Sequence, residues 1–476
     1  MRVELFGVGT QSESRAITAQ RRLNCQVEVR REQDRTVFAL TSRPGLKPFI
    51  TSLGASPSRG MWAVNTLSQP LLFTVHGAIL YSINNAGVTN MIGTILTTTG
   101  DVSMVDDGTY LVLVDGTNGW VYNMVTPAGL NKITDGNFTG TPRTVTWQDN
   151  YFIVTSKTKQ WQLSQISPSI DPTVWPFNQI GFGSSGSGAL QHGRAYHNIL
   201  NLFGDTYAEF WQDTGSPDLP YALIPGSAQQ YGLAAPFSLR SFDNSLAGLF
   251  NSIEGGLNVS RLSGFSLKKI SDHDMDEILA GYSTVSDAQS ISFNYSGHPV
   301  YIMNLPSAGK SWMYDGYANV WSELQSGSMR YWGTHSANFL SRILVSDYNN
   351  GNIYQIDGNT YDDNGTAIQM EVISKHIWND DKYVGIKQIQ IDIESGVGLV
   401  SGQGVKPVCD LQVSKDGGAS FYSIGFSSMG PIGNYTTRMK WNNIGAARDW
   451  VLKLRITDPV KRVITGASAE ITGSGF

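Results

Sequence analysis

Two glycine-rich motifs in this sequence are of the kind that bind phosphate groups. GFGSSG (181–186) fits the GxGxxG pattern of dinucleotide-binding loops, and GKS (309–311) resembles the end of a P-loop. Such loops bind phosphate only where a strand leads into them and a helix follows. Pro172 and Pro176 precede the first motif and no helical pattern follows it, and Asn304 stands where the second needs its first glycine. We therefore predict ordinary loops at both places and no cofactor.

The histidines and cysteines do not form a catalytic or metal-binding pattern. The seven histidines stand at positions 76, 192, 197, 273, 298, 335 and 376, and none has an HxH or HxxxH partner. A zinc site needs several ligands at short spacing. Cys25 and Cys409 lie too far apart in sequence to suggest a disulfide framework. No GxSxG motif indicates a serine hydrolase. We expect no catalytic residue and no metal.

One further motif resembles part of an enzyme fold. SKDGGASF (414–421) is similar to the Asp-box of sialidase propellers, with Ser414, Asp416, Gly418 and Phe421 at its defining positions. In that motif the aspartate accepts hydrogen bonds from backbone N–H groups of a turn, and the aromatic ring packs below. The motif occurs once here and lies outside the repeat described next. We therefore interpret it as a structural turn.

The composition favours an all-β protein. Only 15% of the 476 residues are charged, while 51 are glycine and 11% are aromatic. Tight turns need glycine, and strands favour aromatic residues. The best helical candidate is the stretch around Asp272–Leu279, with Ser271 as its expected N-cap.

A hairpin pattern recurs seven times between residues 71 and 358. Each copy has an apolar strand, a short loop of Gly, Asn, Asp or Ser, and a second strand with an aromatic or aliphatic anchor. The anchors are Leu80, Trp120, Trp161, Trp211, Val259, Trp312 and Ile353. Their spacing of about 40–50 residues matches the blades of a β-propeller. We predict about seven blades, with Trp120, Trp161, Trp211 and Trp312 packing between them; a generic β-sandwich is the alternative.

Different sequence surrounds the repeat. Residues 1–48 are polar and Arg-rich, and after Gly358 a polar linker leads to alternating strands such as 386–394 and 450–457. We expect a propeller over 49–358 and a smaller β platform domain over 359–476, completed by the N-terminal segment 1–48. That arrangement would place Cys25 and Cys409, both reduced, in one domain.

The net charge of −5 is unevenly distributed. Residues 1–48 carry nine basic and five acidic side chains, residues 370–476 carry twelve and ten, and residues 49–369 carry thirteen and twenty-four. Tight DNA binding depends on Lys and Arg meeting phosphates. The acidic middle argues against it, and suits either a wall that DNA slides past or a merely soluble surface.

No targeting or membrane segment is indicated. The first fifteen residues contain no apolar core of a secretion signal. No run of about eighteen apolar residues could form a transmembrane helix. We expect the protein to be made and folded in a cytoplasm.

Several segments resemble the tail hub, or nozzle, family of short-tailed phages, whose members are also called packaged-DNA-stabilisation proteins. The resemblance runs over about residues 16–360 and is weak from 370 onward. The segments that carry it include AITAQRRLNCQVE (16–28), RPGLK (43–47), DPTVWPFNQIGFGS (171–184), FGDTYAEFWQDTG (203–215), with Glu209 and Trp211 in place, and DYNNGNIYQID (347–357).

The resemblance implies a structural protein of the virion tail, assembled in the host cytoplasm, and not an enzyme. It implies a hexameric ring below the portal and adaptor proteins, which continues the DNA channel, retains packaged DNA until ejection and anchors tail fibres or spikes. A needle or plug protein is a further possible partner, and duplex DNA would pass without sequence-specific binding. The alternative is a glycan-processing, sialidase-like propeller, or a glycan-binding one; the first would need an arginine cluster on the propeller axis.

Overall fold

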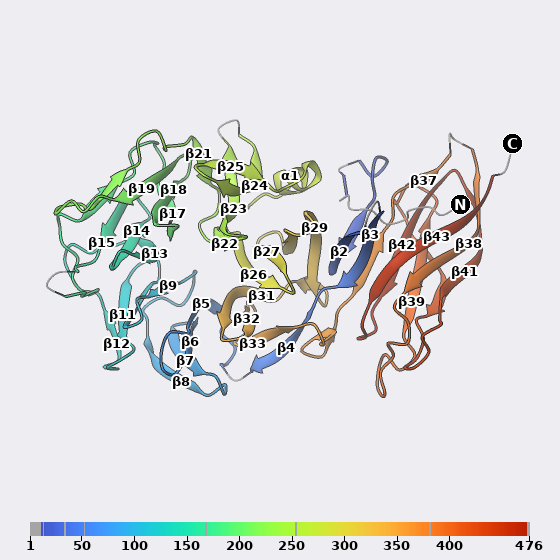
Figure 1. The fold of residues 1–476 in the computed structure, drawn as a ribbon, viewed down its shortest axis with the longest axis horizontal. Helices are drawn as coiled ribbons and strands as arrows, with labels where there is room; N and C mark the ends of the chain where they lie inside the picture. Colours follow the sequence, from blue (N-terminus) through green and yellow to red (C-terminus); the bar gives the residue numbers. More distant parts are fainter. Residues whose placement is uncertain are drawn as a thin grey trace.

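Short apolar strands joined by tight turns account for nearly all of the regular structure. The computed structural model describes residues 11–473 apart from 13, 33–34, 52, 167–168, 253–254 and 380–381. Pairs of residues with positive φ form hairpin turns, as at Asp149 (φ 52°) and Asn150 (φ 66°), and at His197 (φ 53°) and Asn198 (φ 57°). Two successive residues of this kind match the right-handed twist of the strands they join. These turns give a ring of blades beside a two-layer sandwich (Figure 1).

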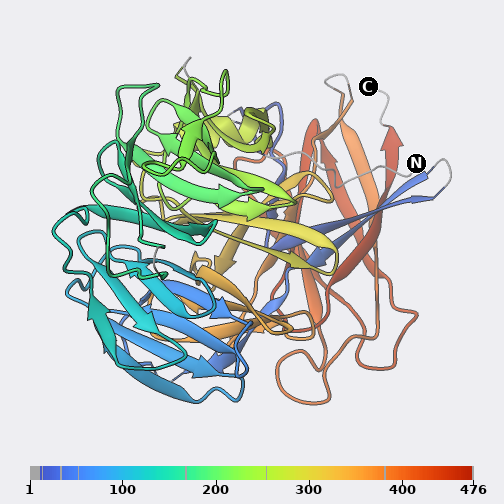
Figure 2. The same cartoon turned by 60° about the vertical axis from the view of Figure 1, so that its left-hand side comes forward.

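Seven blades of antiparallel strands form the ring, and the fold class predicted from the sequence is confirmed (Figure 2). Each anchor residue of the repeat lies on the third strand of its blade. Blades one to four comprise β5 (Ser58–Val64), β6 (Leu71–His76), β7 (Ile79–Asn84) and β8 (Thr89–Thr94); β9 (Ser103–Asp106), β10 (Tyr110–Val114), β11 (Gly119–Asn123) and β12 (Leu130–Lys132); β13 (Pro142–Gln148), β14 (Tyr151–Ser156), β15 (Gln160–Leu163) and β16 (Ile180–Phe182); and β17 (Leu190–Tyr196), β18 (Ile199–Gly204), β19 (Ala208–Asp213) and β20 (Tyr221–Leu223).

The last three blades are more elaborate than the first four. Blade five has a first strand in two pieces, blade six has a short extra strand, and blade seven borrows its fourth strand from the N-terminal segment. They comprise β21 (Tyr231–Leu233), β22 (Arg240–Phe242), β23 (Ser245–Ser252), β24 (Leu257–Ser263) and β25 (Ser266–Lys269); β26 (Gln289–Tyr295), β27 (His298–Leu305), β28 (Lys310–Asp315), β29 (Val320–Ser326) and β30 (Met329–Arg330); and β31 (Gly333–Phe339), β32 (Arg342–Asp347), β33 (Ile353–Asp357) and β4 (Gly45–Ile50), extended by β34 (Asp362–Asp363) and β35 (Thr366–Ala367).

The closing strand β4 departs from one expectation. It pairs antiparallel with β33, Gly45 lying opposite Asp357. Residues 45–48 were expected to belong with the platform, yet they complete the last blade. A strand that joins the two ends of a propeller leaves no open edge in the ring. The exact limits at residues 48 and 358 stay predictions.

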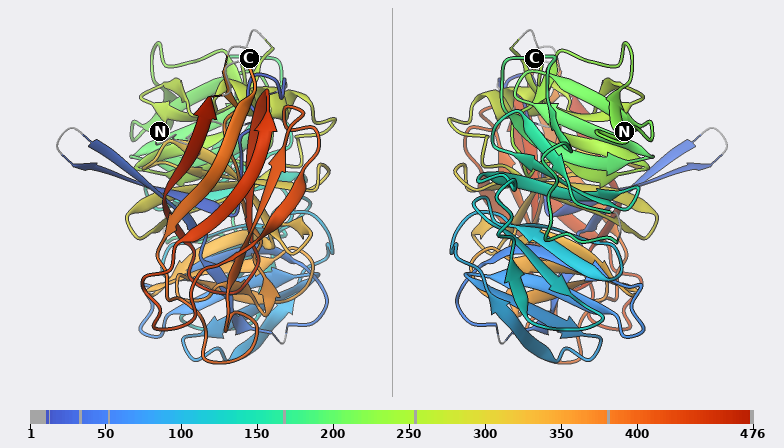
Figure 3. Two further views of the ribbon diagram at one scale, coloured as in Figure 1. Left: turned by 90° about the vertical axis from the view of Figure 1, so that its right-hand side faces the viewer. Right: turned by 90° about the vertical axis from the view of Figure 1, so that its left-hand side faces the viewer.

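The sandwich combines the rest of the N-terminal segment with the C-terminal region. Its core contains Cys25 and Cys409, both buried and free. The strands β2 (Cys25–Glu32) and β3 (Arg35–Ser42) extend beyond the body of the sandwich (Figure 3). One sheet runs β2 (Cys25–Glu32), β3 (Arg35–Ser42), β43 (Val463–Gly473), β38 (Val384–Ile393) and β41 (Met439–Ala447); the other contains β1 (Arg21–Leu23), β36 (Met370–Ile373), β42 (Asp449–Ile456), β39 (Val408–Ser414) and β40 (Tyr422–Ser428), with β37 (Ile377–Trp378) beside β42.

The described residues form one α-helix, α1 (His273–Ala280). Its N-cap is Asp272, whose Oδ1 accepts a hydrogen bond from the Met275 amide at 2.8 Å. Ser271, the expected cap, instead donates its hydroxyl to Asp276 at 2.6 Å. Asp and Ser are equally good N-cap residues. The choice between these two neighbours therefore depends on the residue at which the helix begins and not on the residue type. In the part of the chain that is described, no helix has the length and apolar character to cross a membrane.

Candidate functional site at the junction of propeller and sandwich

The short strand β1 links the two bodies. It runs parallel to β29 of blade six, with Leu23 beside Glu323, and antiparallel to β36 of the sandwich, with Leu23 opposite Glu371. One sheet of eleven strands therefore continues from the propeller into the sandwich. The next residue, Asn24, has a φ of 55° and turns the chain into the other layer of the sandwich.

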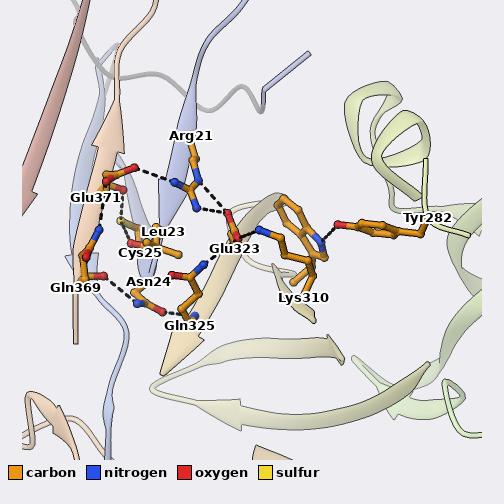
Figure 4. A network of polar contacts seen from close by, with 11 residues as sticks. Arg21, Leu23, Asn24, Cys25, Tyr282, Lys310, Glu323, Gln325, Gln369 and Glu371 are labelled. Atoms are coloured by element: carbon orange, nitrogen blue, oxygen red, sulfur yellow. Dashed lines mark hydrogen bonds and ion pairs between the residues drawn. The ribbon is translucent and has the colours of Figure 1, made fainter. Parts of the chain in front are cut away.

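A network of charged side chains surrounds β1 (Figure 4). Arg21 donates from Nε and Nη2 to Oε2 of Glu323, at 2.8 and 2.6 Å, and from Nη1 to Oε1 of Glu371 at 2.9 Å. Lys310 donates from Nζ to Oε1 of Glu323 at 2.7 Å. Glu323 and Lys310 belong to the propeller, and Glu371 belongs to the sandwich. Arg21 therefore joins carboxylates from both bodies.

Burial makes this network sensitive to the loss of any member. The side chains of Glu323 and Glu371 are only 4% and 7% exposed, while Arg21 is 28% exposed. Burial by itself would raise the pKa of Glu323, but the charges and hydrogen bonds of Arg21 and Lys310 lower it below its ordinary value. Burial likewise opposes the charge on Arg21, and the two glutamates raise its pKa overall. Both partners thus stay charged.

Asn24 fixes the backbone next to the network. Its amide donates to the Glu323 carbonyl at 2.8 Å, and its Nδ2 donates to the Gln369 carbonyl at 2.8 Å. Its Oδ1 accepts from the Gln325 amide at 2.9 Å and from Nε of Arg43 at 2.9 Å. A single buried side chain therefore bonds to both bodies and to the start of the closing strand.

A second ion pair, Arg43 with Asp363, is almost completely buried. The two side chains are 3% and 0% exposed. Arg43 donates from Nη1 to Oδ1 of Asp363 at 2.9 Å and from Nη2 to the carbonyl of Gln325 at 2.8 Å, and it lies 5.0 Å from the ring centroid of Tyr331. Burial would lower the pKa of Arg43, but Asp363 raises it. A planar guanidinium satisfies several acceptors at once, which a lysine cannot do.

A cavity of about 940 Å³ lies beside the network, between blade six, α1 and the sandwich. Trp312, Gly418 and Phe421, three of the residues singled out from the sequence, line it together with Arg21 and Glu323. The structure therefore brings one predicted blade residue next to the Asp-box turn. Trp312 donates from Nε1 to the Tyr282 hydroxyl at 3.2 Å.

The Asp-box residues form a hydrogen-bonded turn. Asp416 accepts from the Ser420 amide at 2.9 Å and from the Ser414 hydroxyl at 2.6 Å, and Ser414 Oγ accepts from the Gly418 amide at 2.8 Å. The hydroxyls of Ser414 and Ser420 hold the pKa of Asp416 well below its usual range. The Phe421 ring lies under Lys453, 4.2 Å from its Nζ.

The other three tryptophans singled out from the sequence lie in cores shared by neighbouring blades. Trp120 lies with residues of blades one and two, and Trp161 and Trp211 lie where blades three and four meet, their ring centroids 5.2 Å apart. Whether these side chains dominate the packing between blades stays a prediction. Trp175, Trp321 and Trp450 are buried about as completely as Trp161 and were not singled out.

The GFGSSG loop binds a carboxylate of its own chain. The amides of Ser184 and Ser185 donate to Oε1 of Glu209 at 2.7 and 2.6 Å, and Trp211 donates from Nε1 to Oε2 at 3.0 Å. Glu209 is fully buried. No helix follows this loop, which lies within the described residues. The backbone groups that could bind a phosphate thus bind a buried glutamate, and the motif is structural.

The junction contains no activated nucleophile in the part described. Burial raises the pKa of the Cys25 thiol to about 12, so it is protonated near neutral pH. Each network carboxylate is held by a cation. No group of three His, Cys, Asp or Glu side chains among the described residues could hold a metal ion. The arrangement is suited to holding two bodies together.

Sequence reasoning missed the network itself. Arg21 and Arg43 lie in segments that carried the family resemblance, but Glu323, Glu371 and Asp363 drew no attention. For Glu323 and Asp363, the available signal was the excess of basic residues in 1–48 and of acidic residues in 49–369; Glu371 lies outside that acidic region. Opposite net charges on two segments of one chain attract each other, but they do not identify the residues that pair.

The fold and the junction define a protein built as a seven-bladed propeller joined to a β-sandwich by one continuous sheet. The chain belongs to the family of the phage tail hub Gp10: residues 6–361 match "Bacteriophage P22 Gp10, beta-propeller", and residues 369–472 match "Bacteriophage P22 Gp10, beta-sandwich". It is a structural protein of the phage tail, and the family predicted from the sequence is confirmed. The match also extends past residue 370, where the sequence resemblance had been weak.

Solved structures that match the chain include two WD40 propeller domains. The WD40 propeller domain of Doa1 has 11% identity and a TM-score of 0.42, covering 66% of this chain and 97% of that chain. The Neurospora crassa Pan2 WD40 domain has 7% identity and a TM-score of 0.42, covering 66% and 95%. No curated protein sequence matches significantly.

Proposed function

We propose that this chain forms the hub, or nozzle, of a short phage tail. Six copies would form a ring below the portal and adaptor, continue the DNA channel, retain packaged DNA and anchor fibres or spikes. The observation that carries the proposal is that both family matches lie on bodies joined by one continuous sheet. A part that transmits load between neighbours needs a fixed angle between its domains, and a sheet braced by buried ion pairs supports such an angle.

The ring follows from how identical subunits assemble. Heterologous contacts that repeat by a rotation close into a ring. The acidic excess of residues 49–369 supports a surface past which DNA moves without adhering, since tight contact would require basic groups at the phosphates.

The test is the size and shape of the purified assembly. Mass photometry at increasing protein concentration, followed by electron microscopy, should reveal closed six-membered rings with a central opening wide enough for duplex DNA. The measurement is repeated with the portal–adaptor complex of the same phage, because the proposed ring would be in contact with that complex. A chain that stays monomeric alone and does not bind that complex would refute the proposal.

One observation, a group of arginines around His192, supports the glycan-processing alternative, but a second one that it needs, a Tyr–Glu pair beside them, is missing. Arg143, Arg194 and Arg240, which showed no pattern in the sequence, all act electrostatically on His192. Among the described residues, however, the acidic groups that act on these arginines are Asp101 and Asp205. A sialidase-like site would need a Tyr–Glu pair there as well. We therefore expect no hydrolysis of sialosides, and turnover abolished by Arg240→Gln would overturn this expectation.

A further inference from the structure

The hairpin of β2 and β3 continues outward beyond the sheet to which it belongs. On the side away from β2, β3 pairs with β43 at Leu40 and Thr41. Further out, β2 and β3 pair with each other, and no third strand of the described residues joins them. We call this outer part, residues 29–32 and 35–38, the ribbon. It belongs to the two strands that extend beyond the body of the sandwich (Figure 3).

The ribbon has little support from its own chain. The Tyr317 hydroxyl of blade six donates to the Val29 carbonyl, at the base of the ribbon, at 3.3 Å. A two-stranded hairpin is only marginally stable by itself in water. Strand edges whose backbone N–H and C=O groups lack a strand partner pair readily with another chain. We therefore expect another chain to cover the ribbon.

A group of exposed apolar side chains lies on β39, β40 and the loops that flank them. Phe426 of β40 is 70% exposed, and its diagonal neighbour on the same face of the sheet is Val408 of β39, which is also exposed. The loops before β39 and after β40 pack together, since the Met429 amide donates to the Pro407 carbonyl at 2.8 Å. We call Phe426, Val408 and three exposed residues of these loops the apolar patch; the three are Val400, Ile432 and Tyr435. Exposed apolar side chains that gather in one place mark interaction sites.

The ribbon and the apolar patch lie on opposite sides of the sandwich. β40 is the last strand of the sheet that runs through β39, β42 and β36 to β1. The chain passes from β1 into β2 through Asn24, so the ribbon starts from the far side of that sheet. Two different surfaces on opposite sides of a subunit can form a contact that repeats by a rotation, and such a contact closes into a ring.

We propose that the ribbon of each copy lies on the apolar patch of the next copy in the ring. This contact rests on the ring proposed above and names the surfaces that form it. A second copy is the occupant that the structure favours, because one repeated contact covers both surfaces of every copy. A different protein bound to either surface would leave the other one exposed.

The first experiment removes each surface in turn from the full-length protein. In one variant the dipeptide Asn-Gly replaces residues 30–37, which leaves Val29 and Phe38, already opposite each other, joined by a two-residue hairpin turn. The other variant is Phe426→Lys, which places a charge on a side chain that is exposed in the single chain and buried in the proposed contact. Each should raise the protein concentration at which half of the rings have formed by about a hundredfold or more, since the contact loses apolar area or buries an unpaired charge.

Phe177→Lys is the matched control. Phe177 lies in blade three and is 77% exposed, so the variant introduces the same charge away from both surfaces and should leave ring formation unchanged. Mass photometry measures the rings. Thermal unfolding at a concentration where every protein is monomeric should give the wild-type Tm for Phe426→Lys and Phe177→Lys, which shows that a lost ring is not a lost fold.

A mixture of the two variants tests whether the two surfaces bind each other. The shortened variant keeps its apolar patch and Phe426→Lys keeps its ribbon, so a pair of them has one intact contact and cannot extend it. Chemical cross-linking of an equimolar mixture should give dimers with one copy of each variant and no larger species. Each variant alone should stay monomeric under the same conditions.

The outcomes separate this contact from the hub proposal. Rings formed by both variants at the wild-type concentration would overturn the contact and leave the hub proposal in place. Loss of rings in both variants without a mixed dimer would also overturn it, because the two surfaces would then bind something other than each other. A wild type that forms no ring, alone or on the portal–adaptor complex, would refute the hub proposal and this contact with it.

Discussion

At the scale of single residues, the junction depends on a glutamate shared by two cations. One carboxylate oxygen of Glu323 accepts hydrogen bonds from Arg21 and the other accepts one from Lys310. The Glu323 side chain is nearly inaccessible to water. Removing the partners of a buried charge destabilises the folded protein far more than an exposed ion pair stabilises it. Of these two cations, Arg21 lies 302 residues from Glu323 in sequence and Lys310 lies on the neighbouring strand.

Glu323→Gln should lower the free energy of unfolding by about 2–3 kcal/mol at pH 7, somewhat below the range for a fully buried pair, because Arg21 keeps Glu371. The effect should depend on pH. The pKa of Glu323 in the folded protein lies below its ordinary 4.5, so its contribution is complete above about pH 4.5 and is lost as the pH falls through the lower folded value. Urea unfolding at pH 7 and pH 3 measures this.

Glu394→Gln is the matched control. Its pair with Lys461 is exposed on both sides, 48% and 48%, so the variant should change stability by less than about 1 kcal/mol. Equal losses for the two glutamate variants, or a Glu323→Gln loss that grows at pH 3, would contradict the role given to the network.

The buried pair of Arg43 and Asp363 makes a separate prediction. Arg43→Met and Asp363→Leu should each cost about 3–5 kcal/mol, because each leaves the other charge buried and alone. The double variant should lose about 2–3 kcal/mol less than the sum of the two. Denaturant unfolding of the four proteins gives this coupling, and strictly additive losses would argue against a direct interaction.

At the scale of elements, the closing strand β4 depends on a glycine. A Cβ at Gly45 would lie 2.4 Å from the backbone carbonyl oxygens of Asp362 and Thr360, which cannot move as a side chain could. Gly45→Ala should therefore destabilise the protein by about 1–3 kcal/mol, and hydrogen exchange should increase first in β4 and β33. Gly140→Ala, where nothing lies within 4 Å, is the control. Unchanged exchange in β33 would show that β4 does not hold the blade closed.

The same elements show what a sequence can predict. The hairpins around Trp120 and Trp312 were predictable, because both strands and the turn lie within some twenty residues and follow local rules. The places of β1 and β4 were not, because their partners lie more than 300 residues away and strand patterns do not name a partner. The Asp-box turn could be predicted because its hydrogen-bonding residues lie within a few positions of one another. Glu323 could not, because nothing near it in sequence distinguishes it from the other acidic residues.

At the scale of the whole molecule, the acidic middle bears on DNA. If the excess acidic side chains of residues 49–369 line the opening of a ring, isolated rings should bind duplex DNA weakly. Acidic groups do not neutralise phosphates, so contact would release no counterions to favour binding. Fluorescence anisotropy with a labelled duplex at physiological salt should give a dissociation constant well above micromolar. A dissociation constant below micromolar, or an opening lined by Lys and Arg, would contradict this prediction without contradicting the hub proposal.

The long reach of β1 and β4 also affects how each chain is made. Synthesis proceeds from the N-terminus, and the Arg43 side chain precedes its partner Asp363 by 320 residues. Until β33 and β36 leave the ribosome, the first strands expose unpaired backbone edges, which are prone to pairing with the wrong chain. Closing so long a loop is slow. Nascent chains should therefore depend on chaperones until the last blade is complete, and newly made protein should resist proteolysis only after release from the ribosome.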